Sequence, residues 1–378
     1  MITHITLDDL EDLALGAAVL GTGGGGDPYI GKLFARAAIE EHGPVRLLSL
    51  EEVPDEVRVL TCGAMGAPTI LIEKIASGDE MGLAFDTYEA HTGTKVEAVM
   101  PFEAGGINST IPVMIAAKRG LPLVDADGMG RAFPQLEMET FNVYGVPASP
   151  VAIADEQGNT GIIQTDTAAK AEWIARGITI RMGGQAYIAN YGMDGQTARR
   201  VSVPGTVSLA IGIGRTLREA RENHQDMIQA LIDFFATTHY EEARIVGSGK
   251  ITDVSRRMEN GWSVGIATIE PFGGGTPMKI RIQNENLVVE QGEEVLAIVP
   301  DLICLLDVDT AEPILTERLR YGQRVNILAV RVPPIMRTPE ALAVFGPRAF
   351  GLKHDYVGLG LELEPLVKSE TAAILDPA

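Results

Sequence analysis

The sequence predicts an α/β protein in which an N-terminal three-layer α/β domain with a mostly parallel sheet precedes a C-terminal part containing a small β-barrel or sandwich. In the first half, strand-like and helix-like segments alternate, which is typical of a parallel sheet covered by helices. Between 243 and 333, short strand-like segments are separated by turn signals, which is typical of a barrel or sandwich. The length of 378 residues suits two domains, which we place at 1–168 and 169–378.

Two helices are expected to flank a run of glycines near the N-terminus. Thr6 is placed to cap a helix that runs to about Leu20. After the glycines, Asp27 and Pro28 form the cap and first position of a second helix, which Gly43 ends.

The glycines between these helices admit more than one interpretation. Gly21, Gly23 and Gly26 have the spacing of a dinucleotide-binding loop, but a helix rather than a strand precedes them, so no nicotinamide or flavin cofactor is expected. A tight turn is the structural alternative, although it needs fewer glycines. Bare backbone lets a ligand approach closely, and the next helix N-terminus supplies partial positive charge. We therefore predict substrate contacts from a loop that comprises Thr22, Gly23, Gly24, Gly25 and Gly26.

Strand and helix patterns alternate after the second helix. Strand-like runs are followed by helices that begin near Thr69 and after Asn108, and the runs themselves are 57–66, 96–106 and 121–128. Ligand sites of such sheets lie beyond the carboxyl ends of the strands. Three segments should therefore converge on one site: 63–68, 103–108 and 125–131.

The second half is expected to begin with a long helix over roughly 204–235. The β-rich module at 243–333 carries turn signals at Asn260-Gly261, Gly273–Gly275, Gln291-Gly292 and Tyr321-Gly322. Two polar stretches, QNENL at 283–287 and VPDLI at 299–303, lie inside strand-like runs. Buried polar groups usually pair structurally, and a direct role in a site is the alternative. A final segment, 338–356, is expected to fold back onto the first domain.

Acidic residues at two strand ends form the main candidate site. On one strand, Asp125 and Asp127 would point to the same side, about 6 to 7 Å apart. Either a cation lies between them or one of the two has a raised pKa and acts as acid or base. Glu103 could add a third oxygen, so Asp125, Asp127 and Glu103 are the predicted catalytic set and the candidate ligands of a divalent metal such as magnesium or manganese. The structural alternative is that these aspartates accept backbone N–H groups.

Neighbouring residues are candidates for substrate binding. Asn108 and Gly106 follow Glu103, and Arg131 is a counter-charge either for the aspartates or for a substrate, with a purely structural ion pair as the alternative. Cys62 ends a strand near the same site, but free cysteines are usually buried and inert. The six histidines show no metal-ligand spacing, which argues against a zinc site.

Charge and hydropathy exclude several classes of protein. A net charge of −20 disfavours nucleic acid and anionic membrane surfaces, because both need a basic face. No apolar run is long enough to span a membrane, and the acidic N-terminal segment does not read as a secretory leader, so we expect a cytoplasmic protein. A homo-oligomer is a further expectation that the sequence leaves open.

A set of ordered motifs resembles the S-methyl-thiohydantoin desulfurase family, long catalogued as a domain of unknown function beside hydantoinase/oxoprolinase proteins. The motifs are LGTGGGGDP, GAMGAPT, FEAGGIN, VDADGMGRAFP, QNENL, PDLI, RYGQRV and GPRAFGLKHDY, which together extend from about Leu10 to Tyr356. The resemblance implies an N-terminal α/β domain, a β-rich module and hydrolysis of a carbon–sulfur bond in a thiohydantoin-like ring. The positions that match are Gly23–Gly26, Glu103, Gly105, Gly106, Asn108, Asp125, Asp127, Gly128, Arg131 and Pro134.

These observations lead to one hypothesis and two alternatives. The hypothesis is a hydrolase of a small five-membered cyclic amide, thiohydantoin-like or hydantoin-like, whose water is activated by carboxylates or by a metal. The first alternative is a non-catalytic partner subunit of a hydantoinase/oxoprolinase complex that binds a nucleotide or metabolite. The second is a lyase in which the same carboxylates abstract a carbon-bound proton.

Overall fold

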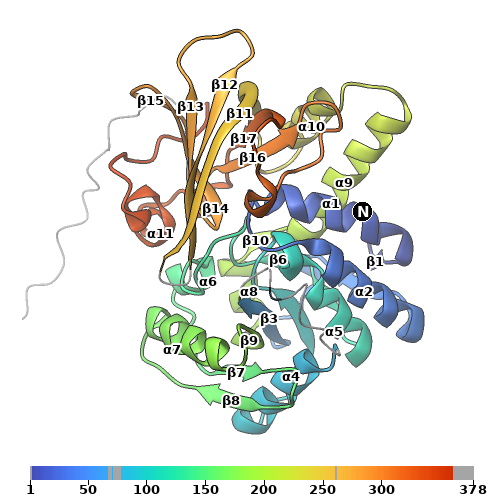
Figure 1. Cartoon of the computed structure of the whole chain (residues 1–378). Coiled ribbons are helices and arrows are strands. Elements are labelled where there is room, and N and C mark those ends of the chain that lie inside the picture. Colours follow the sequence, from blue (N-terminus) through green and yellow to red (C-terminus); the bar gives the residue numbers. More distant parts are fainter. Residues whose placement is uncertain (1, 67–69, 71–77, 260–261, 361–378) are drawn as a thin grey trace, which may run out of the picture.

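The predicted α/β fold class is confirmed by a computed structural model, which describes residues 2–66, 70, 78–259 and 262–360 (Figure 1). In Figure 1 a curled antiparallel sheet lies above an α/β part whose sheet has helices on two sides, with α2 and α5 to its right and α7 to its left. Within the described residues, no helix combines the length and the apolar character needed to cross a bilayer.

The sheet of the α/β part has four parallel strands at its centre. Its strand order is β1-β2-β5-β4-β3-β9-β7-β8, where β2, β5, β4 and β3 run parallel and the remaining pairs are antiparallel. The bounds are β1 (His4–Ile5), β2 (Val45–Leu48), β3 (Arg58–Gly66), β4 (Ala98–Pro101), β5 (Leu123–Val124), β7 (Val151–Ala154), β8 (Thr160–Ile163) and β9 (Gln185–Asp194). Since β9 pairs with β3, this sheet continues past the domain boundary that we predicted at residue 168.

The two N-terminal helices form as the sequence predicts. They are α1 (Leu10–Leu20) and α2 (Pro28–His42). A 3₁₀ turn, η1 (Leu7–Asp9), precedes α1 and is capped at Thr6. The Asp27 carboxylate accepts a hydrogen bond from the Tyr29 N–H at 3.0 Å, and Gly43 ends α2 with a φ of +93°.

The predicted long helix over 204–235 is two helices. The chain turns at His224, whose φ is +53°, and Asp226 caps the second helix by accepting from two backbone N–H groups. The helix predicted near Thr69 falls outside the described residues. The remaining helices are α4 (Glu80–Thr92), α5 (Ile111–Arg119), α6 (Thr140–Val143), α7 (Ala168–Arg181), α8 (Gly195–Val201), α9 (Thr206–Glu222), α10 (Met227–Ala236) and α11 (Pro339–Phe345). Further 3₁₀ turns are η2 (Leu50–Glu52), η3 (Gly106–Ser109), η4 (Thr316–Arg318), η5 (Pro334–Met336) and η6 (Pro347–Phe350).

The β-rich module is an antiparallel sheet, curled like half of a barrel, with the strand order β15-β14-β13-β12-β11-β17-β16. Three of the predicted turn signals join its strands, whereas Asn260-Gly261 lies outside the described residues. In β13 every second side chain is buried, as expected for a strand with one face on a core. The bounds are β11 (Ala243–Glu259), β12 (Trp262–Pro271), β13 (Met278–Gln283), β14 (Glu285–Gln291), β15 (Glu294–Ile298), β16 (Leu302–Asp307) and β17 (Arg324–Val330).

The strand predicted over 121–128 breaks in the middle. Its first half is β5, and its second half, β6 (Ala126–Asp127), leaves the large sheet to pair with β10 (Val203–Pro204). The side-chain alternation of one continuous strand therefore does not apply across Asp125. The expectation that Asp125 and Asp127 share one face of a strand is wrong for this reason.

The C-terminal segment contacts the α/β part through aromatic side chains. The rings of Phe345 and Phe133 lie 5.0 Å apart, and the Tyr144 hydroxyl donates to the Ile335 carbonyl at 2.6 Å. These contacts join α11 and its surroundings to the loop that follows β6 and to the end of α6.

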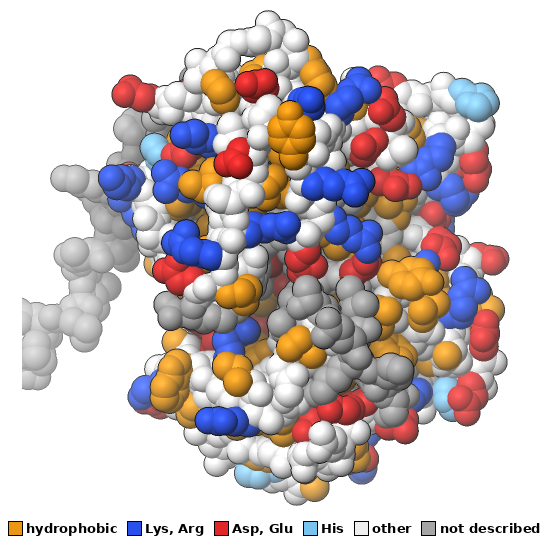
Figure 2. All heavy atoms as spheres, viewed as in Figure 1, with side chains coloured by type: hydrophobic (Ala, Val, Ile, Leu, Met, Phe, Trp, Pro, Cys, Tyr) orange, Lys and Arg blue, Asp and Glu red, His pale blue; other side chains and the backbone are white. Residues whose placement is uncertain are grey.

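Charges of both signs mix on the face drawn in Figure 2. Lys and Arg side chains lie among Asp and Glu side chains there, so this face has no large patch of a single sign. The net charge of −20 is therefore not concentrated on it.

Helices α1 and α9 cross in very close contact. A Cβ atom built on Gly214 of α9 would overlap the backbone carbonyl of Asp12, and one on Gly16 of α1 would overlap that of Ala210. The Asp12 carboxylate also accepts two hydrogen bonds from Arg218, each at 3.0 Å. The crossing thus depends on glycine in both helices.

We predict that Gly214→Ala lowers the free energy of unfolding by about 1 to 3 kcal/mol, because the added methyl group must push the two backbones apart. Gly82→Ala in α4 is the matched control, since a Cβ there meets nothing within 4 Å. That control should be neutral or stabilising by up to about 1 kcal/mol. Urea unfolding of both variants measures the difference, and equal midpoints would contradict the close crossing.

Candidate active site

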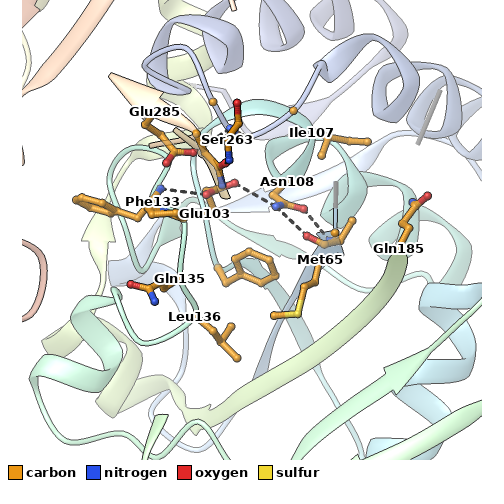
Figure 3. Close-up of a pocket in the computed structure, with 18 of the residues that line it drawn as sticks. Met65, Glu103, Ile107, Asn108, Phe133, Gln135, Leu136, Gln185, Ser263 and Glu285 are labelled. Carbon is orange, nitrogen blue, oxygen red and sulfur yellow. Dashed lines mark hydrogen bonds between the residues drawn. The ribbon is translucent and has the colours of Figure 1, made fainter. Parts of the chain in front are cut away.

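A pocket of about 220 Å³ lies where the two parts of the molecule meet (Figure 3). The α/β part supplies the glycine loop (Gly24–Gly26), the end of β3 at Ala64–Gly66, and Glu103 just after β4. The β-rich module supplies Ser263 and Glu285, among others. The pocket lies beyond the carboxyl ends of parallel strands β3 and β4, as ligand sites in such sheets generally do.

Glu103 is a buried carboxyl group held by two N–H donors. Its side chain is 3% exposed, and it accepts from the Asn108 amide at 3.1 Å and from the Phe133 backbone N–H at 3.2 Å. Burial raises the pKa of Glu103 well above its usual range, and the neighbouring carboxylates of Glu285 and Asp127 raise it further. Glu103 therefore holds its proton more readily than an exposed glutamate does.

Glu285, the first residue of β14, faces Glu103 across the pocket (Figure 3). It is 2% exposed; its Oε1 accepts from the Gly25 N–H at 3.3 Å, while its buried Oε2 has no hydrogen-bond partner among the described residues. Burial raises the pKa of Glu285 to about 7, against the opposing effect of the Arg131 charge. The two carboxyl groups therefore titrate as a coupled pair, in which Glu285 is the member with a pKa near 7.

The glycine loop makes room for the Glu285 carboxylate. A Cβ on Gly24 would overlap Glu285 Oε1, and Gly25 has a φ of +71°, which favours glycine. The Gly24 N–H donates to the Gly21 carbonyl at 2.8 Å and the Gly25 N–H donates to Glu285. Both N–H groups thus already donate to acceptors within the protein. The loop therefore binds the Glu285 carboxylate with the Gly25 N–H group rather than offering this group to a ligand oxygen.

Asn108 ties Glu103 to the end of β3. Its Oδ1 accepts from the Ala64 N–H at 2.7 Å, and its Nδ2 donates to the Ala64 carbonyl at 3.3 Å as well as to Glu103. This arrangement leaves the Glu103 carboxyl in one orientation toward the pocket (Figure 3).

Asp125 and Asp127 lie outside the residues that line the pocket. Asp125 accepts from the Val207 and Ser208 N–H groups, both at 2.9 Å, and so caps the start of α9. Asp127 accepts from the Met129 N–H at 3.0 Å and from the Gly130 N–H at 2.8 Å, which holds the turn after β6. The structure thus corresponds to the alternative in which both aspartates bind backbone amides.

The predicted trio of Asp125, Asp127 and Glu103 does not fit a metal ion. Asp127 uses both oxygens and Asp125 uses Oδ1 on backbone N–H groups, and Glu103 uses both of its oxygens on N–H donors. Among the described residues, no group of three or more His, Cys, Asp and Glu side chains is arranged to hold a metal. We therefore derive no chemical step through a metal.

Four further predicted contact residues lie behind the pocket wall. Thr22, Gly23, Gly106 and Arg131 are buried but do not line the pocket. The Gly23 carbonyl accepts from the Thr316 N–H at 2.7 Å, and a Cβ on Gly106 would overlap the Gly25 carbonyl. These contacts hold the glycine loop in place. Of the predicted binding residues, Gly24, Gly25, Gly26 and Asn108 do line the pocket.

Sequence reasoning missed several pocket residues, of which Glu285 is the most important. The motif QNENL contained a signal, because an acidic residue opens a strand-like run there. Buried polar residues usually form hydrogen bonds within the fold, however, and this explanation was preferred. Arg176 and Glu172 of α7 also line the pocket, and they form an ion pair. The Arg176 guanidinium lies 4.1 Å from the Trp262 ring of β12. Cys62 is fully buried, its pKa is raised by burial, and it does not line the pocket.

The remaining walls combine apolar side chains with amides. Met65 and Leu136 supply apolar surface, and Gln135 and Gln185 supply polar groups (Figure 3). Phe102 adds further apolar surface. Such a lining is typical of sites for small molecules that carry a few hydrogen-bonding groups.

Family models and a solved structure of another protein match nearly the whole chain. The family models described as S-Me-THD-like, N-terminal domain and S-Me-THD-like, C-terminal domain match residues 8–165 and 165–359. A crystal structure of a protein from Chromobacterium violaceum, a structural genomics target, has a TM-score of 0.80 at 24% identity, covering 95% of this chain and 100% of that chain. This likeness shows the fold. No functionally curated protein matches the chain significantly.

The raised pKa of Glu285 predicts an unusual dependence of stability on pH. Its carboxyl has a pKa of about 7 in the folded protein, against about 4.3 when unfolded, so the folded state holds more protons between these values. The contribution to stability is complete below about pH 4.3 and is lost as the pH rises through about 7, by at most about 1.4 kcal/mol per pH unit. Glu285→Gln should remove this contribution and make the pH dependence shallower.

Urea unfolding at intervals from pH 4.5 to pH 8 measures this dependence. Glu293→Gln, at an exposed glutamate in the turn between β14 and β15, is the control and should keep the wild-type slope. If Glu285→Gln and Glu293→Gln have the same slope, Glu285 titrates in its ordinary range and the buried pair is not as described.

Proposed function

Because the chain belongs to the S-Me-THD-like family, that of the S-methyl-thiohydantoin desulfurases, we propose that it hydrolyses the carbon–sulfur bond of an S-methyl-thiohydantoin-like ring. The observation that carries this proposal is the pair of facing carboxyl groups, Glu103 and Glu285, in a pocket of small-molecule size. Their environments differ: burial and neighbouring carboxylates raise the pKa of Glu103 well above its usual range, whereas the pKa of Glu285 is about 7. Such pairs are suited to acid–base chemistry.

In the first half of the proposed reaction, water adds to the ring carbon that bears sulfur. Glu285 accepts a proton from the water as the carbon–oxygen bond forms, and its unpartnered Oε2 is the atom available for this. Glu103 gives its proton to the adjacent ring nitrogen, which becomes an N–H group. The result is a tetrahedral carbon that carries both the hydroxyl group and the methylthio group.

In the second half, the carbon–sulfur bond breaks. The sulfur leaves with the proton held by Glu285, and Glu103 recovers a proton from the hydroxyl group as this becomes a carbonyl. One water is consumed, methanethiol is released, the ring becomes a hydantoin, and both carboxyl groups return to their starting states. No oxidant or reductant is needed.

The pocket's composition supports a small cyclic amide over a nucleotide. Apart from Arg176, which is already paired with Glu172, the charged side chains that line it are acidic. Acidic walls repel phosphate groups, so the alternative of a nucleotide-binding partner subunit is not favoured. The Gln135 and Gln185 amides can instead donate to and accept from a ring that carries N–H and C=O groups.

We predict that Glu103→Gln and Glu285→Gln each lower kcat by about 10²-fold to 10⁴-fold, because each removes one acid–base group. The assay measures methanethiol with a thiol reagent and the hydantoin product by mass spectrometry, using S-methyl-thiohydantoin as substrate. Glu293→Gln is the surface control and should keep wild-type activity. A carboxyl-pair variant with wild-type turnover, or ring opening without methanethiol release, would contradict the proposal.

A separate variant distinguishes the pair from the aspartates that the sequence suggested. Asp125→Asn should leave kcat within a few-fold of the wild type, because Asp125 caps α9 and does not reach the pocket. It should change the free energy of unfolding little, because the Asn amide oxygen can still accept the backbone hydrogen bonds and Asn caps helices about as well as Asp. A folded Asp125→Asn protein without activity would restore the aspartate mechanism.

The reaction should also depend on pH in a defined direction. Since Glu285 must be ionised to accept a proton, kcat/KM should rise with pH up to about 7, where its carboxyl titrates. At higher pH it should fall again as Glu103 loses its proton. A profile of kcat/KM that is flat from pH 5 to pH 9 would rule out this assignment of acid and base.

A further inference from the structure

Arg131 is a fully buried guanidinium that lies behind the pocket rather than in it. Its side chain is 0% exposed and it is absent from the pocket lining. Its Nη2 donates to the Thr22 hydroxyl at 2.6 Å and to the Asn286 carbonyl at 3.4 Å. It therefore touches the glycine loop on one side and the residue next to Glu285 on the other.

All hydrogen bonds recorded for this guanidinium go to uncharged oxygens. Besides Thr22 and Asn286, the acceptors are the backbone carbonyls of Ala132 at 2.9 Å, Pro300 at 3.2 Å and Asp301 at 2.8 Å. Its positive charge is thus not neutralised through a hydrogen-bonded carboxylate. A buried charge in this situation must be balanced by a nearby charge that it does not touch.

Glu285 is the strongest candidate for that balance. Of the acidic groups near Arg131, Glu285 acts on it most strongly, followed by Cys304, Asp301 and Glu103. Cys304 keeps its proton, because burial raises the pKa of its thiol to about 12. The Asp301 carboxylate instead accepts hydrogen bonds from Val332, Tyr356 and Leu359, and burial and neighbouring carboxylates raise the pKa of Glu103 well above its usual range.

We propose that Arg131 is a positioning residue whose buried charge keeps Glu285 in its ionised, proton-accepting form without touching the substrate, an inference that rests on the proposed function. The hydrogen bonds of Arg131 set the glycine loop against Glu285, and its charge compensates a carboxylate that receives one backbone N–H. Arg176 of α7 adds a weaker positive influence on Glu285. Burial lowers the pKa of Arg131 to about 10, so it stays charged across the pH range in which Glu285 titrates.

The test follows the Glu285 carboxyl directly, without substrate. Protein labelled with ¹³C at glutamate side chains is titrated by NMR, and the Glu285 signal is assigned by its loss in Glu285→Gln. Arg131→Met removes the charge and should move the Glu285 titration upward by about one pH unit or more. Arg131→Lys keeps a charge and should restore most of the wild-type titration.

A matched control separates the charge from the hydrogen bonds. Thr22→Val removes one acceptor of the guanidinium but leaves its charge, so it should lower stability without moving the Glu285 titration. An unchanged titration in Arg131→Met, or equal shifts in Arg131→Met, Arg131→Lys and Thr22→Val, would overturn the inference. Because the readout needs no turnover, a failure of the proposed reaction leaves this result interpretable by itself.

If Arg131→Met does not fold, the same pair is tested from the other side. Glu285→Gln leaves the Arg131 charge without its balance and should lower the thermal midpoint in low salt. Arg131→Met/Glu285→Gln removes both charges, so it should be more stable than Arg131→Met alone and should recover folding. A double variant as unstable as Arg131→Met would mean that the two charges do not interact and would refute the inference.

Discussion

The docking of the β-rich module against the glycine loop is the contact on which the site depends. The Thr22 carbonyl accepts from the Asn286 N–H at 2.9 Å, and the Gly23 carbonyl accepts from the Thr316 N–H at 2.7 Å. Side chains on the loop would prevent this approach, since a Cβ on Gly23 would lie 2.8 Å from Asn286 Nδ2 and one on Gly24 would overlap Glu285. The pocket therefore exists only when both parts are in place. The loop between them must consist of glycines, because any side chain there would block the contact.

The electrostatics of the site follow from this contact. Docking buries Glu285 against Gly25 and brings it opposite Glu103, which the loop after β4 already holds in place. Two acids in one dry space do not both ionise readily, because each loses hydration and feels the charge of the other. The charges near each carboxyl group then make their pKa values differ. Glu285 lies near the buried Arg131, whose charge lowers its pKa, and Glu103 lies near Asp127, whose charge raises its pKa.

The two aspartates of the VDADG motif show why acidic residues at strand ends are difficult to interpret. Asp125 accepts a hydrogen bond from the first turn of α9, and Asp127 accepts one from the turn that follows β6, although both lie near the carboxyl edge of the sheet. The same residue types with the same spacing would suit catalysis if the strand were continuous. The difference arises from the switch of β6 to pair with β10, a long-range choice that local pattern does not encode.

The sequence by itself determined the α/β class, both N-terminal helices with their ends, the strands around 57–66 and 98–101, and three turns of the β-rich module. These features depend on periodicity, caps and turn residues, which act between near neighbours in the chain. It also indicated Glu103, Asn108 and three glycines at the pocket. Only the tertiary structure decided that Glu285 is the second carboxyl and that Arg131 lies behind it, because these residues meet through packing between distant segments. Burial and pairing across such distances set the charge state of each acid, and no local pattern of residues contains that information.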